Sequence, residues 1–260
     1  MFLVEPPRSQ GDVHFRLFGI PIRIHPMFWF ITLLLGLQGR DTPPGEVLIW
    51  VIAVVVSIVI HEMGHALVQR HYGGRPRIVL YGMGGLAICE DCDRSTRSQI
   101  LIALAGPCAG FLFALLLVIL IRALGHGVGI ELPNNAQITS GPMAHEVGFH
   151  LLGGAIFWEQ LPNPHANQML LNLLWINTLW GLVNLLPIYP LDGGQVSREL
   201  CQIGNPRGGI IMSLRISVVA AVAMAVFGFV AWGSFYTALM FGYLAYSSYR
   251  TLEAYRESSW

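Results

Sequence analysis

Residues Val47 to Val68 read V-L-I-W-V-I-A-V-V-V-S-I-V-I-H-E-M-G-H-A-L-V, an apolar run that turns polar only at His61, Glu62 and His65. At 3.6 residues per turn, the two histidines lie on one face of a helix, so their imidazoles can converge on one cation. Glu62 lies about 100° round the helix from His61, close enough to act as a general base without being a ligand. The H-E-x-x-H spacing therefore predicts two zinc ligands and the base of a hydrolytic reaction.

The alternative to a metal site is a pair of ordinary core residues. A single histidine in an apolar helix is more often a hydrogen-bonded core residue than a ligand. Here, however, two histidines flank a glutamate after thirteen residues, Leu48 to Ile60, that are interrupted only by Ser57. Ionisable groups inside a membrane segment are costly and usually functional, so we favour the metal site.

The 260-residue chain has the composition of a membrane protein. Hydrophobic residues make up 54% and charged residues 12%, with a mean hydropathy of +0.57, whereas a soluble domain carries about 25% charged residues. We predict an all-α polytopic protein of about six transmembrane helices, forming a single bilayer-embedded domain over residues 1–260. The 15 arginines, with no lysine, form no basic stripe, so nucleic acid is not an expected partner.

The predicted spans are apolar segments separated by polar or glycine- and proline-rich stretches. They cover residues 24–37, 47–70, 100–121, 169–188, 210–232 and 235–249. The first span, which ends at the polar residues 38–41, is short for a hydrocarbon core of about 30 Å. The third contains A-G-P-C-A-G at 105–110, and small residues there favour close packing against the helix that carries the histidines.

Three regions lie outside these spans. Residues 1–25 are expected to form a strand or hairpin at the membrane surface. Residues 78–88 read as two short strands around a glycine-rich turn, either an ordinary surface hairpin or a re-entrant element. Residues 122–168 are predicted to be a solvated extracytosolic loop whose histidines lack ligand spacing. Cys89 and Cys92 have no second cysteine pair to complete a zinc site, so free cytosolic thiols are favoured.

The fourth span contains three asparagines. Interhelical hydrogen bonds account for Asn172 and Asn177. Asn184 is different, because prolines three and six residues later break the helix and lead into Asp192. The unwound chain is expected to bring the Asp192 carboxylate to the membrane-embedded end of the helix.

The arginines are distributed unequally between the two sides of the membrane. With six spans, one side receives twelve arginines and the other only Arg40 and Arg122, while Arg215 lies at the start of a span. The positive-inside rule makes the arginine-rich side cytosolic, so both termini are predicted to be in the cytosol. The histidine pair and Asp192 then lie at a similar depth, as a shared metal requires.

These motifs together resemble those of the site-2 protease family of intramembrane zinc metalloproteases. His61-Glu-Met-Gly-His65 matches the family's H-E-x-G-H, and the stretch from Asn184 to Gly193 matches its N-x-x-P-x-x-P-L-D-G. The resemblance covers roughly residues 47–200, which we take as the core of the domain.

The resemblance implies a function and a set of site residues. It implies an endopeptidase in the plasma membrane of a prokaryote that cleaves transmembrane segments of single-pass membrane proteins, with one Zn²⁺ per chain; it indicates no particular oligomer. His61, His65 and Asp192 would ligate zinc, Glu62 would be the base, and Asn184 would hold substrate or the developing oxyanion. The residues implied for pairing with an extended substrate are Gly82, Gly84, Gly85 and Leu86.

Two other classes of protein remain open at this stage. A prenyl-protein protease or a heat-shock-type membrane peptidase would also carry H-E-x-x-H on a span, but typically with a glutamate as third ligand from a later helix. The L-D-G sequence after a proline-broken span argues against both. A non-catalytic scaffold or ion-binding transporter would not need a carboxylate at Glu62.

Overall fold

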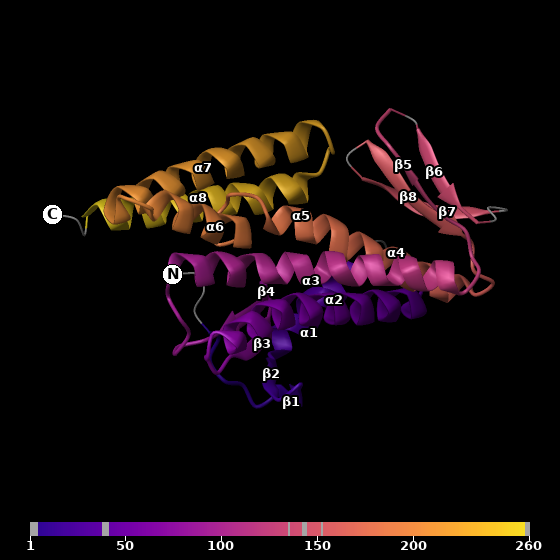
Figure 1. The fold of residues 1–260 in the computed structure, drawn as a ribbon, viewed down its shortest axis with the longest axis horizontal. Coiled ribbons are helices and arrows are strands. Elements are labelled where there is room, and N and C mark those ends of the chain that lie inside the picture. The colour runs from indigo at the N-terminus through magenta and orange to yellow at the C-terminus, as the bar shows by residue number, and fades with distance from the viewer. Residues whose placement is uncertain (1–4, 38–41, 135, 142–144, 152, 258–260) are drawn as a thin grey trace.

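The protein combines long helices with two small sheets (Figure 1). The computed structural model describes residues 5–37, 42–134, 136–141, 145–151 and 153–257, with the backbone alone at Arg207. The predicted end of the first span at residues 38–41, including Arg40, lies outside this set. The all-α prediction is wrong in part, because the helical membrane protein also contains two four-stranded sheets.

The helices account for three of the predicted spans. In chain order the helical elements are α1 (Pro26–Gly36), α2 (Pro44–His71), α3 (Thr96–Ala123), α4 (Pro164–Trp175), the π-helical turn η1 (Ile176–Trp180), α5 (Gly181–Asn184), α6 (Asp192–Gln202), α7 (Pro206–Val230) and α8 (Phe235–Glu257). Of the described residues, those of α2, α3 and the 208–230 part of α7 form helices long and apolar enough to cross a membrane. The prediction of a multi-pass membrane protein is confirmed.

The other three predicted spans differ from expectation. The first is the short apolar helix α1, of 11 residues. The fourth is divided among α4, η1 and α5, which follow one another without a break. The sixth is α8, which is longer than predicted and is not among the three candidate spans. The count of six spans is therefore reduced to three clear candidates.

Local signals fix where several helices begin. The side chains of Ser95, Asn163 and Asn205 accept hydrogen bonds from backbone N–H groups in the first turns of α3, α4 and α7. Such caps satisfy donors that have no partner within the helix. Helix α2 begins with Pro44, where a missing N–H costs nothing.

The first sheet packs against the C-terminal half of α2. Its strands are β1 (Val13–Leu17), β2 (Ile20–Ile24), β3 (Arg77–Tyr81) and β4 (Gly84–Ile88), in the order β1-β2-β3-β4. Strands β2 and β3 are parallel, and the two hairpins are antiparallel. Both hairpins that the sequence predicted are therefore present. Isoleucines of β2 and β3 are buried against Val59, Met63 and Ala66 of α2.

The second sheet replaces the predicted solvated loop, and that prediction is wrong. Its strands are β5 (Val128–Glu131), β6 (Gln137–Ser140), β7 (Glu146–Leu151) and β8 (Gly154–Glu159), in the order β6-β5-β8-β7. Phe149 and Trp158 belong to one buried cluster with Leu117 of α3, Leu173 of α4 and Ala53 of α2, and the sheet lies at the far end of α2 from the first sheet (Figure 1). The strands are four to six residues long and β6 is exposed along its whole length, so they did not stand out from the proline, asparagine and glycine residues around them.

A polar contact explains one of the asparagines in the fourth predicted span. Asn177 of η1 donates from Nδ2 to Ser57 Oγ of α2 at 2.8 Å and to Leu173 O of α4 at 2.8 Å. The predicted interhelical bond is therefore present at Asn177. Asn172 instead accepts a hydrogen bond from Gln168 within its own helix.

Candidate active site

The two histidines of α2 face each other across one helical turn. Their Nε2 atoms lie 3.2 Å apart, and the side chain of His65 is 9% exposed. The other ring nitrogen of His65, Nδ1, lies 2.7 Å from Ile102 O of α3. If Nδ1 carries the proton and donates to that carbonyl, the lone pair of Nε2 is left for a cation, as is usual in metal-bound histidine.

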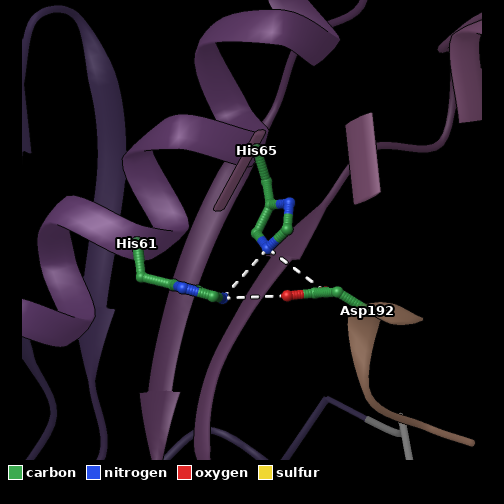
Figure 2. Close-up of side chains that lie close together, drawn as sticks. All are labelled: His61, His65 and Asp192. Carbon is green, nitrogen blue, oxygen red and sulfur yellow. Dashed lines mark hydrogen bonds and ion pairs between the residues drawn. The ribbon is translucent and has the colours of Figure 1, made fainter. Parts of the chain in front are cut away.

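Asp192 completes the cluster from the first residue of α6. Its Oδ2 lies 3.1 Å from His61 Nε2 and its Oδ1 lies 3.4 Å from His65 Nε2. Figure 2 shows the three side chains pointing toward a common centre from α2 and α6. The prolines after Asn184 end α5, and the chain turns back so that the carboxylate reaches the histidines.

The donor atoms of this cluster fit a zinc ion. One ligand atom from each of His61, His65 and Asp192 lies within 4.8 Å of the others. Asp192 is buried, and although Oδ2 is close to His61 it makes no hydrogen bond of acceptable geometry. Two imidazoles and one carboxylate are a ligand set of catalytic zinc sites, which keep a fourth position open.

Glu62 lies beside the cluster at the wall of a cavity of about 230 Å³. It is 6% exposed. A Cβ atom at Gly85 of β4 would overlap its carboxylate, so the strand can approach Glu62 closely because residue 85 is glycine. Tyr81 of β3 also lines the cavity; burial raises the pKa of its hydroxyl, and the Glu62 carboxylate raises it further.

Comparison with known proteins places this arrangement in a family. The model of peptidase family M50 matches residues 49–231, which is more than half of the chain. The chain belongs to peptidase family M50. The resemblance to site-2 proteases expected from the two motifs is thereby confirmed.

Individual relatives of this M50 chain are distant. A Synechocystis sp. protein provisionally named as a zinc metalloprotease is 29% identical over 245 residues, covering 86% of this chain and 55% of that protein. A zinc metalloprotease of Methanocaldococcus jannaschii is 24% identical over 216 residues, covering 81% of this chain and 50% of that protein. The chain therefore spans about half the length of the curated relatives it matches.

A solved structure shares the fold. The site-2 protease from Methanocaldococcus jannaschii matches with a TM-score of 0.56 and 21% identity, covering 92% of this chain and 94% of that one. Zinc is the metal that the family implies, and the cluster of His61, His65 and Asp192 is its candidate site.

The remaining predicted residues of the M50 site are distributed unevenly. Asn184 is 7% exposed and lines the same cavity, and no hydrogen bond of its side chain is found among the described residues. Gly84, Gly85 and Leu86 also line the cavity, whereas Gly82 lies in the turn between β3 and β4 and does not. The roles assigned to these residues stay predictions.

The sequence did not indicate several polar residues of the cavity wall. Gln69 of α2, Gln195 of α6 and Ser247 of α8 all line it. Gln69 continues the i, i+4 face from His61 through His65, which was a usable signal. Ser247 lies 182 positions after His65 in the sequence, and no local pattern connects the two residues.

The prediction that Cys89 and Cys92 are free thiols is wrong. They form a disulfide just after β4, so the expected free thiols are not what the structure contains. The C-x-x-C spacing allows the two Sγ atoms to meet within one bend. Asp91 lies between them, with Oδ1 3.4 Å from Cys89 Sγ.

Proposed function

We propose that this M50 protein is a zinc-dependent endopeptidase that hydrolyses peptide bonds inside the bilayer, in transmembrane segments of single-pass membrane proteins. The observation that carries the proposal is the convergence of His61, His65 and Asp192 beside Glu62 in one cavity. A ligand set and a base that face the same enclosed space are what metal-assisted peptide hydrolysis requires.

The residues of the chain have distinct parts in the reaction. Zinc held there would polarise a peptide carbonyl and make water more acidic near neutral pH. Glu62 takes the proton from the attacking water and gives it to the leaving amine. The amide of Asn184 is available to donate to the carbonyl oxygen as negative charge develops. The side chains of Glu62, His65 and Asp192 are themselves buried at the wall of the cavity.

The depth of the site supports a substrate within the membrane. His61 is 17 residues into α2, about 25 Å from its start at 1.5 Å per residue. Large apolar side chains are exposed on the outer face of α3, among them Leu112, Leu115 and Ile119, and a lipid bilayer would cover them. A helical substrate must unwind to present a carbonyl, and residues such as glycine, proline or asparagine make unwinding easier.

We place the protein in the plasma membrane of a prokaryote, with both termini cytosolic and one zinc ion per chain. The supporting observations are the arginine distribution and a single cluster of two histidines and a carboxylate within the described residues.

Replacement of the base tests the function. Purified Glu62→Gln, reconstituted with a single-span model substrate, should lose about 10²–10⁴-fold in turnover because the proton acceptor is gone. Its zinc content should match that of the unmodified protein, because the ligands remain. Glu46→Gln, at an exposed position in the first turn of the same helix, is the matched control and should keep full turnover.

Two outcomes would contradict the proposal. Cleavage confined to soluble tails of the substrate, read by mass spectrometry, would exclude an intramembrane site. Cleavage at the full rate by Glu62→Gln would exclude Glu62 as the base. Asp192→Ala should lose most of the bound zinc, and full occupancy in that variant would exclude Asp192 as the third ligand.

A further inference from the structure

The side chain of Gln69 makes one hydrogen bond and leaves its other polar atom without a partner among the described residues. Its Nε2 donates to Ala87 O of β4 at 3.2 Å. Its Oε1 is buried, and no described residue donates a hydrogen bond to it. The residue is 8% exposed and lines the cavity that contains Glu62. A buried acceptor without a partner, in a residue that lines a binding cavity, calls for a donor.

The register of the β3–β4 hairpin shows which backbone groups of β4 face outward. Tyr81 and Gly84 flank the two-residue turn, so they form a hydrogen-bonded pair. The next pair along the ladder, Leu80 and Gly85, is then not hydrogen-bonded, and its polar groups point away from each other. The hydrogen bond that Leu80 O accepts from His25 N, at 2.8 Å, confirms that this carbonyl points away from β4.

Gly85 and Ala87 are therefore the residues of β4 whose N–H and C=O groups face its outer edge, on the side of α2. The bond from Gln69 to Ala87 O agrees with this orientation. Gly85 lies against Glu62, and no bond of its outward groups is found among the described residues. Within β4, the edge open to an incoming strand is thus restricted to Gly85, because the carbonyl of Ala87 is already taken.

We infer that Gln69 is a substrate-binding residue that sets which peptide bond reaches Glu62. An extended peptide paired with Gly85 would meet the next outward position of β4 at Ala87, two residues further along. At that position the peptide N–H cannot bond to the Ala87 carbonyl, because Gln69 Nε2 already donates to it. The peptide N–H donates to Gln69 Oε1 instead. The peptide is then anchored at two points, Gly85 and Gln69, and cannot slide by a residue without losing a buried hydrogen bond.

The inference rests on the proposed endopeptidase function, and its test separates the two. The first measurement needs no turnover. It compares the affinity of a fluorescent transmembrane peptide for the Glu62→Gln protein with its affinity for the Glu62→Gln/Gln69→Met protein. Methionine keeps the length of the side chain and removes both polar atoms. We expect a roughly tenfold weaker affinity, since one buried hydrogen bond is lost. Equal affinities would overturn the inference, whatever the fate of the proposed function.

The second measurement uses the active protein. Gln69→Met should raise KM roughly tenfold with kcat changed much less, and the products should show cuts at neighbouring bonds as well as the original one. A brace that only supports β4 would lower the melting temperature and kcat but leave the position of the cut unchanged. A single unchanged cut position in Gln69→Met would overturn the inference.

An altered substrate identifies the atom involved. Replacing one backbone amide of the substrate by an ester removes a single N–H. The position of interest lies on the side of the cut nearest Gln69. There the ester should weaken binding to the Glu62→Gln protein. It should not weaken binding to the Glu62→Gln/Gln69→Met protein, because the acceptor Oε1 is already absent. Esters one residue away are the matched controls and should affect both proteins alike. Equal losses in both proteins at every position would exclude Oε1 as the acceptor.

Discussion

Gly106 of α3 lies directly against the imidazole of His65 on α2. A Cβ atom at this position would overlap Nε2 of His65 and lie 2.8 Å from Nε2 of His61. These are the two nitrogens proposed to bind zinc. The Gly106→Ala variant should therefore displace the histidine pair and lose most of its zinc and activity, although alanine is a better helix former than glycine. Zinc per chain, measured by elemental analysis, is the readout.

Gly242 of α8 provides the control for that substitution. An added Cβ there would meet nothing within 4 Å, so Gly242→Ala should keep its zinc and be as stable as the original or slightly more so. Normal zinc content in Gly106→Ala would contradict the prediction, because it would mean that α2 and α3 can move apart enough to fit the added methyl group.

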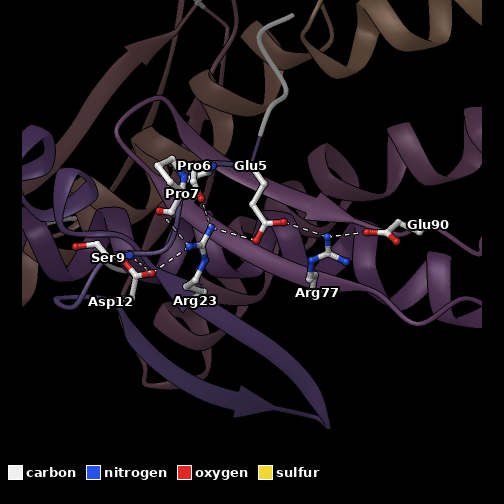
Figure 3. Close-up of polar contacts among 8 residues, drawn as sticks. All are labelled: Glu5, Pro6, Pro7, Ser9, Asp12, Arg23, Arg77 and Glu90. Carbon is white, nitrogen blue, oxygen red and sulfur yellow. Dashed lines mark hydrogen bonds and ion pairs between the residues drawn. The ribbon is translucent and has the colours of Figure 1, made fainter.

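Arg23 of β2 anchors the N-terminal segment to the first sheet, as Figure 3 shows. Its guanidinium donates to Asp12 Oδ2 at 3.0 Å, to Glu5 Oε1 at 3.1 Å and to Pro6 O at 2.7 Å. The Arg23 side chain is 7% exposed and that of Asp12 is 1% exposed. Arg23→Met should leave the buried Asp12 carboxylate without its ion-pair partner and lower the melting temperature by roughly 5 °C or more.

Arg77 of β3 is the matched control, because it also contacts Glu5. Its side chain is 38% exposed, and exposed ion pairs contribute little. Arg77→Met should shift the melting temperature by no more than about 2 °C. Equal shifts in both variants would mean that burial does not distinguish the two arginines.

The metal cluster was predictable from sequence because its geometry is mostly local. The i, i+4 spacing of His61 and His65 fixes their relative position within one helix, and the prolines before Asp192 mark where the chain must turn. The first sheet was partly predictable, because each hairpin is local. The parallel pairing of β2 with β3, which joins the hairpins, has no local signal.

The features that sequence reasoning missed depend on contacts between distant segments. Strands β5 to β8 form a sheet in which Phe149 and Trp158 join a buried cluster with residues of α2, α3 and α4, and strands of four to six residues do not indicate those distant partners. The role of Gln69 appears only when the edge of β4 is placed beside α2. The disulfide was not expected, because a cytosolic location disfavours one.

The Cys89–Cys92 disulfide should contribute measurably to stability under oxidising conditions. It closes a four-residue loop, and loop-closure entropy predicts about 2 kcal/mol. The melting temperature of the oxidised protein should therefore exceed that of the reduced protein by roughly 5 °C. Cys89→Ser/Cys92→Ser should show no such difference.

The other two cysteines serve as the control for the disulfide. Cys108 and Cys201 are free in the structure, so Cys108→Ser/Cys201→Ser should keep the dependence on reductant. Labelling of Cys89 and Cys92 by a maleimide in the absence of reductant would show that the bond does not form.

The two sheets are expected to face opposite sides of the membrane. The first sheet shares a buried cluster with Val59, Met63 and Ala66, near the C-terminal end of α2, whereas the second shares a buried cluster with Ala53. The two sheets thus lie toward opposite ends of a helix long enough to cross a bilayer. Because the excess of arginines falls with the first sheet, we expect that sheet in the cytosol and the second sheet outside.

Labelling of single cysteines would decide the orientation. In a protein whose four native cysteines are serine, Ser9→Cys should react with a membrane-impermeant maleimide only after the cells are opened. Asn134→Cys, in the turn between β5 and β6, should react in intact cells; both positions are exposed. The reverse pattern would put the Cys89–Cys92 disulfide in the oxidising compartment, where such bonds persist. It would also put the β3–β4 hairpin, which lines the active-site cavity, on the outer side, and the substrate would then be cut near the extracytosolic end of its transmembrane segment.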